Sequence, residues 1–442
     1  MKAQAKPYFP YAKSYWTLDQ DLELSPPLAG DHKTEVVVIG AGFAGLATAL
    51  GLIEARPDLN VTVVEAQHAG YGASGRNSGQ IINMPPFVWL LQNHSNCKRL
   101  TNVERAVRTI DAQLAKTLVL ITEAGYEFEL KKGVLQLVAS SPVAAAGMAL
   151  LQQRLERVGV ETSFFDGEAA ADRVAWAGRA VLNVPTYSVH PFKLAQSLRK
   201  LLISRGVSFF EGTPVDRIHS HTGGVTLRGP GYTVEAEKAV MTTNAYTAAH
   251  ILDLNFSYPR AVNWHSYMIA TEVLSQADID RITATGHGFG DAALKFYYGR
   301  IHNGRLLFGG EDRKSALSPE EDRREASYGA LHAEMLSRFP FLDKAQIYAA
   351  WGGAFQRNSL EIPQVRRTGA GGNVILNVAN GGNGVAGTLL SGRLTPQLVL
   401  DGNEDGDASA YLQLMENTGV PWAGLVQSSL GLAATFLRRS LG

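Results

Sequence analysis

Hydrophobic and polar residues form two different periodic patterns near the start of the chain. Residues 35–39 are a short β-branched run that stops at a glycine, which is typical of a buried strand. Residues 44–55 then show helical spacing with small residues at the start, and residues 60–66, NVTVVEA, form a second β-branched run. This order predicts one strand–helix–strand unit over residues 35–66.

The rest of the chain alternates between the same two patterns, without an internal repeat or a low-complexity linker. Helical spacing predicts helices over residues 103–124, 142–158, 190–206 and 385–400. Strands are predicted over residues 133–140, 207–220, 265–273, 294–301 and 305–311, with a hairpin in residues 223–245 whose buried second strand ends at Asn244, and a further strand from residue 373. We therefore expect an α/β protein with two lobes that exchange the chain several times.

A glycine fingerprint lies inside the first strand–helix–strand unit. Gly40, Gly42 and Gly45 satisfy G-x-G-x-x-G directly after the strand and at the start of the helix. Their lack of side chains permits a tight turn and a close approach of backbone to a pyrophosphate, which the helix N-terminus attracts. Glu65 follows Gly45 by twenty residues, where a carboxylate accepts hydrogen bonds from ribose hydroxyls. An adenine dinucleotide is predicted; the alternative is a glycine-rich turn without a ligand.

Two further glycine-rich segments distinguish FAD from NAD. GASGRNSGQ (residues 72–80) and NGGNGVAGTLLSGRL (residues 380–394) resemble the D-amino-acid oxidase (DAO) family of FAD-dependent oxidoreductases. SYMIATEVL, YYGRIHNGRLLFGGED and YAAWGGAFQRNSLEIPQVR resemble its gamma-glutamylputrescine oxidase branch in order and spacing. The resemblance covers the chain from about Ser14 to Leu400.

The resemblance implies a Rossmann-like FAD-binding domain of the glutathione-reductase-like, DAO type, interleaved with an α+β substrate domain on a mixed antiparallel sheet. The expected divisions are an N-terminal arm (1–33), a first FAD-binding part (34–100), mixed segments (101–185), a second FAD-binding part (186–255), a substrate domain (256–345), a last FAD-binding part (346–405) and a C-terminal helical tail (406–442).

The resemblance also implies which residues bind FAD. In addition to the fingerprint and Glu65 they are Ala41, Phe43, Ala44, Ala66, Gly72, Ala73, Ser74, Arg76, Asn77, Ser78, Gly79, Gln80, Val215, Thr243, Asn244, Trp351, Gly353, Gly381, Gly382, Asn383, Gly384 and Val385. No covalent bond is expected, because Arg76 and Asn77 stand where some relatives attach the flavin to a histidine, and Cys97 lies far in sequence from either attachment position. Arg76 is expected to meet a phosphate or a ring oxygen, Val215 to meet adenine, and the helix after Gly384 to face the flavin ring. The alternatives are a polar surface turn at 72–80 and a simple glycine-rich helix cap at 381–384.

Four residues are candidates for the substrate side. In LKFYYGR, strand alternation places Phe296, Tyr298 and Arg300 on one face and Tyr297 on the other. Tyr298 is expected to form a wall and Arg300 to bind a substrate carboxylate; the alternative is a core strand with an exposed arginine. His265 and Trp351, the latter in a tryptophan-glycine turn that the resemblance implies, complete the set, although a lone histidine is more often structural.

These features predict oxidative deamination of a primary or secondary amine or amino acid, with hydride transfer to flavin N5 and reoxidation by O₂ or another acceptor. A flavin monooxygenase is disfavoured because NVANGGNG replaces the GDA-type element of those enzymes. The third functional class that remains is a non-catalytic protein that binds a dinucleotide.

Composition narrows the expected partners and location. Formal net charge is zero and 45% of residues are apolar, so a folded protein without affinity for nucleic acid is expected. Cys97 is the single cysteine, which excludes internal disulfides and multi-cysteine metal sites; no metal is predicted. Without a signal-like or membrane-spanning run, a cytoplasmic location is expected. The amphipathic segment 422–442 is interpreted as a docking helix, with weak membrane contact as the minority view.

Overall fold

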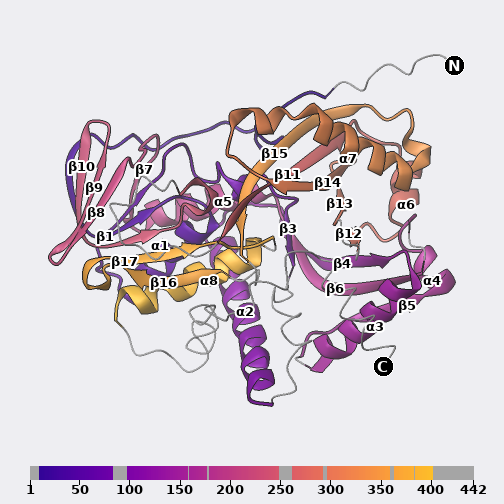
Figure 1. Cartoon of the computed structure of the whole chain (residues 1–442), viewed down its shortest axis with the longest axis horizontal. Coiled ribbons are helices and arrows are strands. Elements are labelled where there is room, and N and C mark those ends of the chain that lie inside the picture. Colours follow the sequence, from indigo (N-terminus) through magenta and orange to yellow (C-terminus); the bar gives the residue numbers. More distant parts are fainter. Residues whose placement is uncertain are drawn as a thin grey trace.

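The computed structural model describes residues 9–82, 97–157, 159–176, 179–247, 261–291, 296–358, 363–382 and 384–401 of the chain. They form two lobes side by side, each built around its own β-sheet (Figure 1). Strands of the two sheets are interspersed along the sequence, so the chain crosses between the lobes several times. The predicted α/β class with two interleaved lobes is confirmed, whereas the exact domain boundaries stay a prediction.

The first sheet has a parallel centre. Its eight strands are β1 (Gly30–Ile39), β2 (Val61–Val64), β7 (Ser208–Phe210), β8 (Arg217–His221), β9 (Gly224–Gly229), β10 (Tyr232–Met241), β16 (Gln364–Thr368) and β17 (Val374–Val378), and six of them follow the order β16-β17-β10-β1-β2-β7. β1 pairs in parallel with both β2 and β10, and β10 pairs in parallel with β17. Parallel strands are covered on both faces, which explains the continuous apolar runs of β1 and β2.

Helices pack against this sheet. They are α1 (Phe43–Ala55), α5 (Pro191–Ser204) and α8 (Gly384–Val399), whereas α2 (Cys97–Glu123) packs on α8 and α5 and projects away from the sheet (Figure 1). Every residue of α1 from Phe43 to Ile53 is buried. α8 packs directly on α1 because Gly392 carries no side chain: a Cβ there would lie 2.6 Å from the carbonyl oxygen of Ala44. The predicted helices over 190–206 and 385–400 are thus confirmed.

The second sheet is mostly antiparallel. Its nine strands are β3 (Gln80–Ile82), β4 (Lys131–Ala139), β5 (Ser163–Asp166), β6 (Ala180–Ser188), β11 (Val262–Thr271), β12 (Gly288–Asp291), β13 (Tyr298–His302), β14 (Arg305–Lys314) and β15 (Ile347–Arg357). Eight of them follow the order β15-β11-β14-β13-β12-β4-β6-β3. The accompanying helices are α3 (Pro142–Arg157), α4 (Gly167–Ala171), α6 (Gln276–Ile282) and α7 (Glu325–Arg338).

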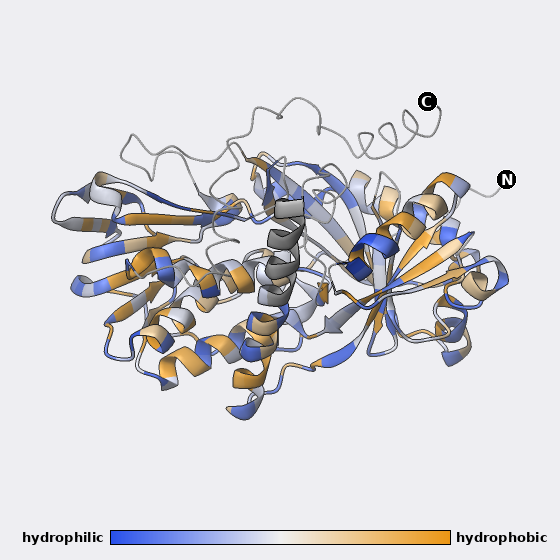
Figure 2. Cartoon of the chain, turned by 90° about the horizontal axis from the view of Figure 1, so that it is seen from below, coloured by the Kyte–Doolittle hydropathy of each residue, from blue (hydrophilic) through white to orange (hydrophobic). Residues whose placement is uncertain are grey.

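The two faces of the second sheet have different coverings. One face packs under α7, where Tyr267 and Phe308 share a core with Tyr328 and Leu331. The strands of this sheet are largely hydrophobic in Figure 2, with hydrophilic residues on the surrounding helices and loops. The other face carries a smaller cluster that includes Met268, Leu307 and Trp351, together with Trp16 from the N-terminal arm and Phe192 from α5. This second face is therefore the one directed to the first lobe.

The N-terminal arm covers the outer edge of β15. The Ala350 amide donates to the Pro10 carbonyl (2.8 Å), and the Ala12 amide donates to the Ala350 carbonyl (2.9 Å). An edge strand otherwise presents unpaired backbone groups to other chains. The arm continues into the short 3₁₀ helix η1 (Tyr15–Thr17).

Other short 3₁₀ helices lie in loops elsewhere in the described chain: η2 (Ala73–Gly75), η4 (Asn244–Tyr246), η6 (Pro319–Arg323), η7 (Pro340–Leu342) and η8 (Ala370–Gly372).

Two predicted strands end earlier than expected. The segment 207–220 is not one strand but two, β7 and β8, because Gly212 has a φ of +61° and Pro214 follows it. β10 ends at Met241 instead of Asn244. The Thr242 amide and hydroxyl still donate to the Ile39 carbonyl (2.9 and 2.8 Å), but the backbone then turns, and Asn244 adopts a φ of +45°. Among the described residues, no helix combines the length and apolar character that crossing a membrane requires. The segment 422–442 lies outside the described residues.

Candidate functional site

The glycine fingerprint lies where β1 passes into α1. Gly40 has a φ of +102°, which favours glycine. A Cβ on Gly45 would lie 2.0 Å from the Gly40 carbonyl oxygen and 2.7 Å from the Thr242 hydroxyl. Glycine at both positions therefore lets the helix start directly against the strand.

Several amide groups at the start of α1 are available to an anion. The Phe43 amide donates to Ser74 Oγ (2.9 Å), whereas the amides of Gly42, Ala44 and Gly45 have no hydrogen-bond partner among the described residues. Free N–H groups and the positive end of the helix dipole together attract phosphate. This part of the chain therefore fits the pyrophosphate of a dinucleotide.

Glu65 is held directly beside this loop. Its Oε2 accepts a hydrogen bond from the Ala41 amide (2.7 Å), and its Oε1 accepts one from Gln67 (2.9 Å). Burial raises the pKa of Glu65 above its ordinary value, although these two bonds act in the opposite direction. Each carboxylate oxygen keeps a second lone pair, so ribose hydroxyls can still donate to it. Ala66 follows Glu65 as an exposed residue.

The segment 72–80 is locked by its own polar groups. Asn77 Nδ2 donates to the carbonyls of Ala73 (3.0 Å) and Ser74 (2.9 Å), and Asn77 Oδ1 accepts from the Gly79 amide (2.8 Å). Gly72 caps η2, and Ser78 leads into β3, which starts at Gln80. Gly79 needs its glycine, because its φ is +72° and a Cβ would lie 2.3 Å from the Val189 carbonyl.

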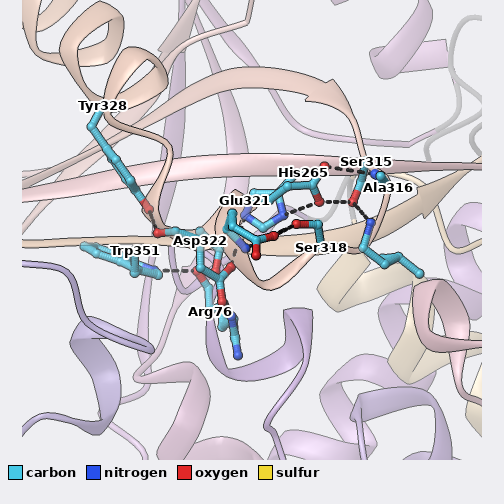
Figure 3. A network of polar contacts seen from close by, with 12 residues as sticks. Arg76, His265, Ser315, Ala316, Ser318, Glu321, Asp322, Tyr328 and Trp351 are labelled. Atoms are coloured by element: carbon cyan, nitrogen blue, oxygen red, sulfur yellow. Dashed lines mark hydrogen bonds and ion pairs between the residues drawn. The ribbon is translucent and has the colours of Figure 1, made fainter.

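Arg76 connects this segment to the second lobe (Figure 3). Its Nη1 donates to the Gly352 carbonyl (3.0 Å) and to Asp322 Oδ2 (3.1 Å), and its Nε donates to the Tyr71 carbonyl (2.9 Å). Its Nη2 has no partner among the described residues. The stem packs on Gly353, where a Cβ would lie 3.2 Å from Arg76 Cδ. Arg76 therefore serves first as a bridge between the lobes, with one donor nitrogen left for a ligand.

His265 belongs to the same network. Its Nε2 lies 3.2 Å from Asp322 Oδ1, and its Nδ1 lies 3.7 Å from Glu321 Oε2. Although burial alone would raise the pKa of Asp322, its contacts with His265 and Arg76 hold that pKa below its ordinary value. Only 4% of His265 is exposed, so its side chain is buried within this network. Its place at the flavin face stays a prediction.

Trp351 lies in the middle of β15 and not in a turn, which corrects the expectation. β15 pairs with β11 through both Gly352 and Gly353, so the strand is continuous there. These glycines provide space instead of a bend, since a Cβ on Gly352 would lie 2.3 Å from His265 Nε2. The Trp351 ring is fully buried and its Nε1 donates to the Arg76 carbonyl (2.8 Å).

The alternation predicted for β13 is confirmed. Tyr298 stacks with Phe296, while the Tyr297 hydroxyl donates to Glu311 on the other side (2.5 Å). Arg300 is 6% exposed, and its Nη1 and Nη2 donate to the carbonyls of Gly79 and Val189 (both 3.0 Å). Burial lowers the pKa of Arg300 to about 10. Its binding of a substrate carboxylate stays a prediction.

The glycine loop at residues 380–384, between β17 and α8, is held by β15 and η4. The Gly381 amide donates to the Gln356 carbonyl (3.0 Å), and the Ala379 amide donates to Asn244 Oδ1 (3.1 Å), which joins this loop to η4 after Thr243. α8 begins at Gly384, where a Cβ would meet open space, and Val385 is buried. Gly382 lies just before, and Asn383 lies outside the described residues.

Val215 lies between β7 and β8. Its backbone N–H and C=O have no hydrogen-bond partner among the described residues, which leaves them available to a planar ring with polar edges. Sequence reasoning missed Asp322, which lies in an ordinary polar segment, and the arm residues Ser14 and Trp16, which contact segment 72–80. The aromatic residues among the prolines of the arm are the one sequence feature that could have indicated Trp16 as a contact residue.

Comparison with known proteins agrees with this arrangement. The chain matches the family described as DAO, FAD dependent oxidoreductase, over residues 35–398. It is 27% identical to a probable oxidoreductase OrdL of Rhizobium meliloti, covering 88% of each chain, and 26% identical to the gamma-glutamylputrescine oxidoreductase of Escherichia coli, covering 92% of this chain and 93% of that protein. The fold resembles glycine oxidase from Geobacillus kaustophilus, with a TM-score of 0.68 at 20% identity over 84% of this chain and 96% of that one. Because the family match spans most of the sequence, the protein belongs to the DAO family of FAD-dependent oxidoreductases.

Proposed function

We propose that the protein catalyses FAD-dependent oxidative deamination of a primary or secondary amine or amino acid. The observation that carries the proposal is a strip of partly exposed side chains on the face of the second sheet directed to the FAD-binding lobe. Trp264 and Ser266 are two residues apart in β11 and so lie on the same face of the sheet. Trp264 is the cross-strand partner of Phe355 on β15. The Tyr298 hydroxyl lies 3.3 Å from Ser266 Oγ. Aromatic surface with a few polar groups suits a small organic ligand.

An ion pair lies beside this strip. Burial, with a smaller contribution from the Asp312 carboxylate, raises the pKa of Tyr298. Asp312 Oδ2 lies 3.5 Å from Arg357 Nη1, and the Arg357 guanidinium lies 5.4 Å from the centre of the Trp264 ring. Arg357 thus balances the Asp312 carboxylate and already lies over the Trp264 ring, so the proposed preference for an amine rests on the aromatic strip and on the hydroxyls of Ser266 and Tyr298. The names of the relatives, which refer to amino acids or to a putrescine derivative, support the same substrate class.

FAD supplies the acceptor for the hydride that leaves the amine carbon. The chain has to hold the amine and keep water out. Tyr298 and Ser266 are proposed to orient the amine nitrogen, and Trp264 and Phe355 to cover it. Arg76 and the start of α8 are proposed to place donors towards the cofactor.

Anaerobic mixing with a panel of amines and amino acids tests this proposal. Bleaching of the flavin by an amine identifies the substrate, and the rate of recolouring in air separates O₂ from another acceptor. A flavin that no amine or amino acid bleaches would leave the proposal without support.

Glu65→Ala is expected to weaken FAD binding by about 10- to 150-fold. Charge-assisted hydrogen bonds contribute roughly 1.5–3 kcal/mol, and each 1.4 kcal/mol is a factor of ten. The Ala41 and Gln67 amides also lose their acceptor. FAD titration of the apoprotein measures the change, with Glu272→Ala, an exposed carboxylate paired with Arg305, as the control. An unchanged dissociation constant would contradict the assignment of Glu65 to the ribose.

FAD is expected to be held without a covalent bond. Arg76 and Asn77 occupy the loop where some relatives of this fold would need a histidine for attachment, and their side chains are engaged with the protein. His68 lies edge-on against the rings of Tyr71 (5.4 Å) and Phe192 (5.7 Å). Acid precipitation should therefore release the yellow colour into the supernatant. A yellow pellet, or a denatured chain heavier by the mass of FAD, would disprove the expectation.

A further inference from the structure

Backbone carbonyls of the FAD-binding segment 72–80 are held from outside by the N-terminal arm. Ser14 Oγ donates to the Gly75 carbonyl (2.7 Å), and Trp16 Nε1 donates to the Asn77 carbonyl (2.7 Å). Ser14 and Trp16 are both buried, with 2% and 1% of their surface exposed. Two residues that precede the first strand thus bind the loop directly.

The Trp16 ring is itself fixed by both lobes. The ring centres of His190 and His302 each lie 4.8 Å from that of Trp16, and the Arg300 guanidinium lies 5.1 Å from it. Arg300 binds the Gly79 carbonyl of the same segment. The indole therefore has little freedom to leave its hydrogen bond with Asn77.

Tyr15 lies between Ser14 and Trp16 in the arm but makes no hydrogen bond to segment 72–80 among the described residues. Its hydroxyl lies 2.9 Å from His302 Nδ1, and its ring stacks on Trp351, with 5.8 Å between ring centres. Trp351 in turn binds the Arg76 carbonyl. Four carbonyls, those of Gly75, Arg76, Asn77 and Gly79, are consequently bound by side chains from outside the segment.

Holding the carbonyls outward fixes the opposite side of the segment. On that side Ser74 Oγ accepts from the Phe43 amide at the start of α1, next to the free amides that suit the pyrophosphate. A loop that is ordered before binding loses less conformational entropy when the ligand arrives. The arm lies before residue 35, where the match to the family model begins, so this support comes from outside the residues that the model matches.

We propose that Ser14 and Trp16 are positioning residues for FAD: they hold segment 72–80 in its binding conformation and so raise the affinity for the cofactor. The proposal rests on FAD binding, which the family establishes, and not on the identity of the amine.

The test is titration of apoprotein with FAD, in parallel with the thermal midpoint of the apoprotein. Ser14→Ala and Trp16→Phe each remove one donor to the segment, and each is expected to raise the FAD dissociation constant about three- to tenfold. Tyr15→Phe is the matched control, because it removes one hydrogen bond of the same turn that does not reach the segment. Its dissociation constant should stay within about twofold of the parent protein.

Three outcomes decide the matter. A higher dissociation constant in Ser14→Ala and Trp16→Phe, with Tyr15→Phe unchanged, supports the proposal. Lower thermal midpoints with unchanged FAD affinity in all variants would reduce the arm to a structural role and overturn it. Equal loss of affinity in all three would assign the effect to docking of the arm as a whole and also overturn it. Ser14→Ala, the smaller change, keeps the test decisive if Trp16→Phe does not fold, and none of these measurements requires an amine.

Discussion

Gly45→Ala is expected to yield a protein that purifies without FAD. The added Cβ would lie 2.0 Å from the Gly40 carbonyl oxygen and 2.7 Å from Thr242 Oγ1, far inside contact distance. The first of these atoms belongs to the backbone and cannot rotate away, so α1 has to move from β1. Because α1 is buried along almost its whole length, that movement is opposed by the core. The amides that would hold the pyrophosphate move with the helix, and we expect at least about a hundredfold weaker binding, or about 2.7 kcal/mol.

Absorbance of the flavin relative to protein, followed by FAD titration of the apoprotein, measures this effect. Gly147→Ala is the matched control: it lies in α3, and a Cβ there meets no atom within 4 Å. Alanine at that position is expected to be neutral or slightly stabilising. Parent-like FAD affinity in Gly45→Ala would mean that the glycine loop does not contact the cofactor as proposed.

Glu211→Ala is expected to cause the largest loss of stability, about 3–5 kcal/mol. The Glu211 side chain is buried and accepts three hydrogen bonds, from Arg199 Nε (2.9 Å) and from the amides of Ser25 and Ala69 (both 2.7 Å). Removing the carboxylate leaves the buried Arg199 guanidinium without its counter-ion and two amides without their acceptor. It also removes one of the hydrogen bonds that hold the arm against the first lobe, because Ser25 belongs to the arm.

Urea unfolding of the apoproteins gives the comparison, with Glu35→Ala as the control for an ion pair. The pair of Glu35 with Arg56 is exposed on both sides, and such pairs contribute at most about 1 kcal/mol. A loss in Glu211→Ala no greater than that in Glu35→Ala would show that the buried pair is not a principal support of the fold.

The strand–helix–strand unit could be predicted because its signals are local. The spacing of Gly40, Gly42 and Gly45 and the position of Glu65 depend on one turn and two short strands, so residues 35–66 contain the whole pattern. The alternation at Tyr297 and Tyr298 is local for the same reason. The predicted ends of strands were wrong where the backbone conformation of a single residue decides them, as at Gly212 after β7 and Asn244 after β10.

The contacts of Arg76 could not be predicted from the sequence. Its partner Asp322 is 246 positions away, and Trp351, which binds its carbonyl, is 275 positions away. No periodicity records which distant loops meet. For the same reason Gly352 and Gly353 were interpreted as a turn. The sequence alone does not distinguish glycine that leaves room for distant side chains, here His265 and Arg76, from glycine that allows the chain to bend. Trp16 was missed since its partner Asn77 lies across the lobe boundary.

The pairing of Pro10 and Ala12 with Ala350 has a consequence for the order of folding. The arm leaves the ribosome well before β15, because more than three hundred residues separate Ala12 from Ala350. Contacts between such distant segments form late, because a long loop has to close first. Until then Trp16 remains exposed to water and β15 has no cover on its outer edge. A segment that is translated early is therefore among the last to reach its native place.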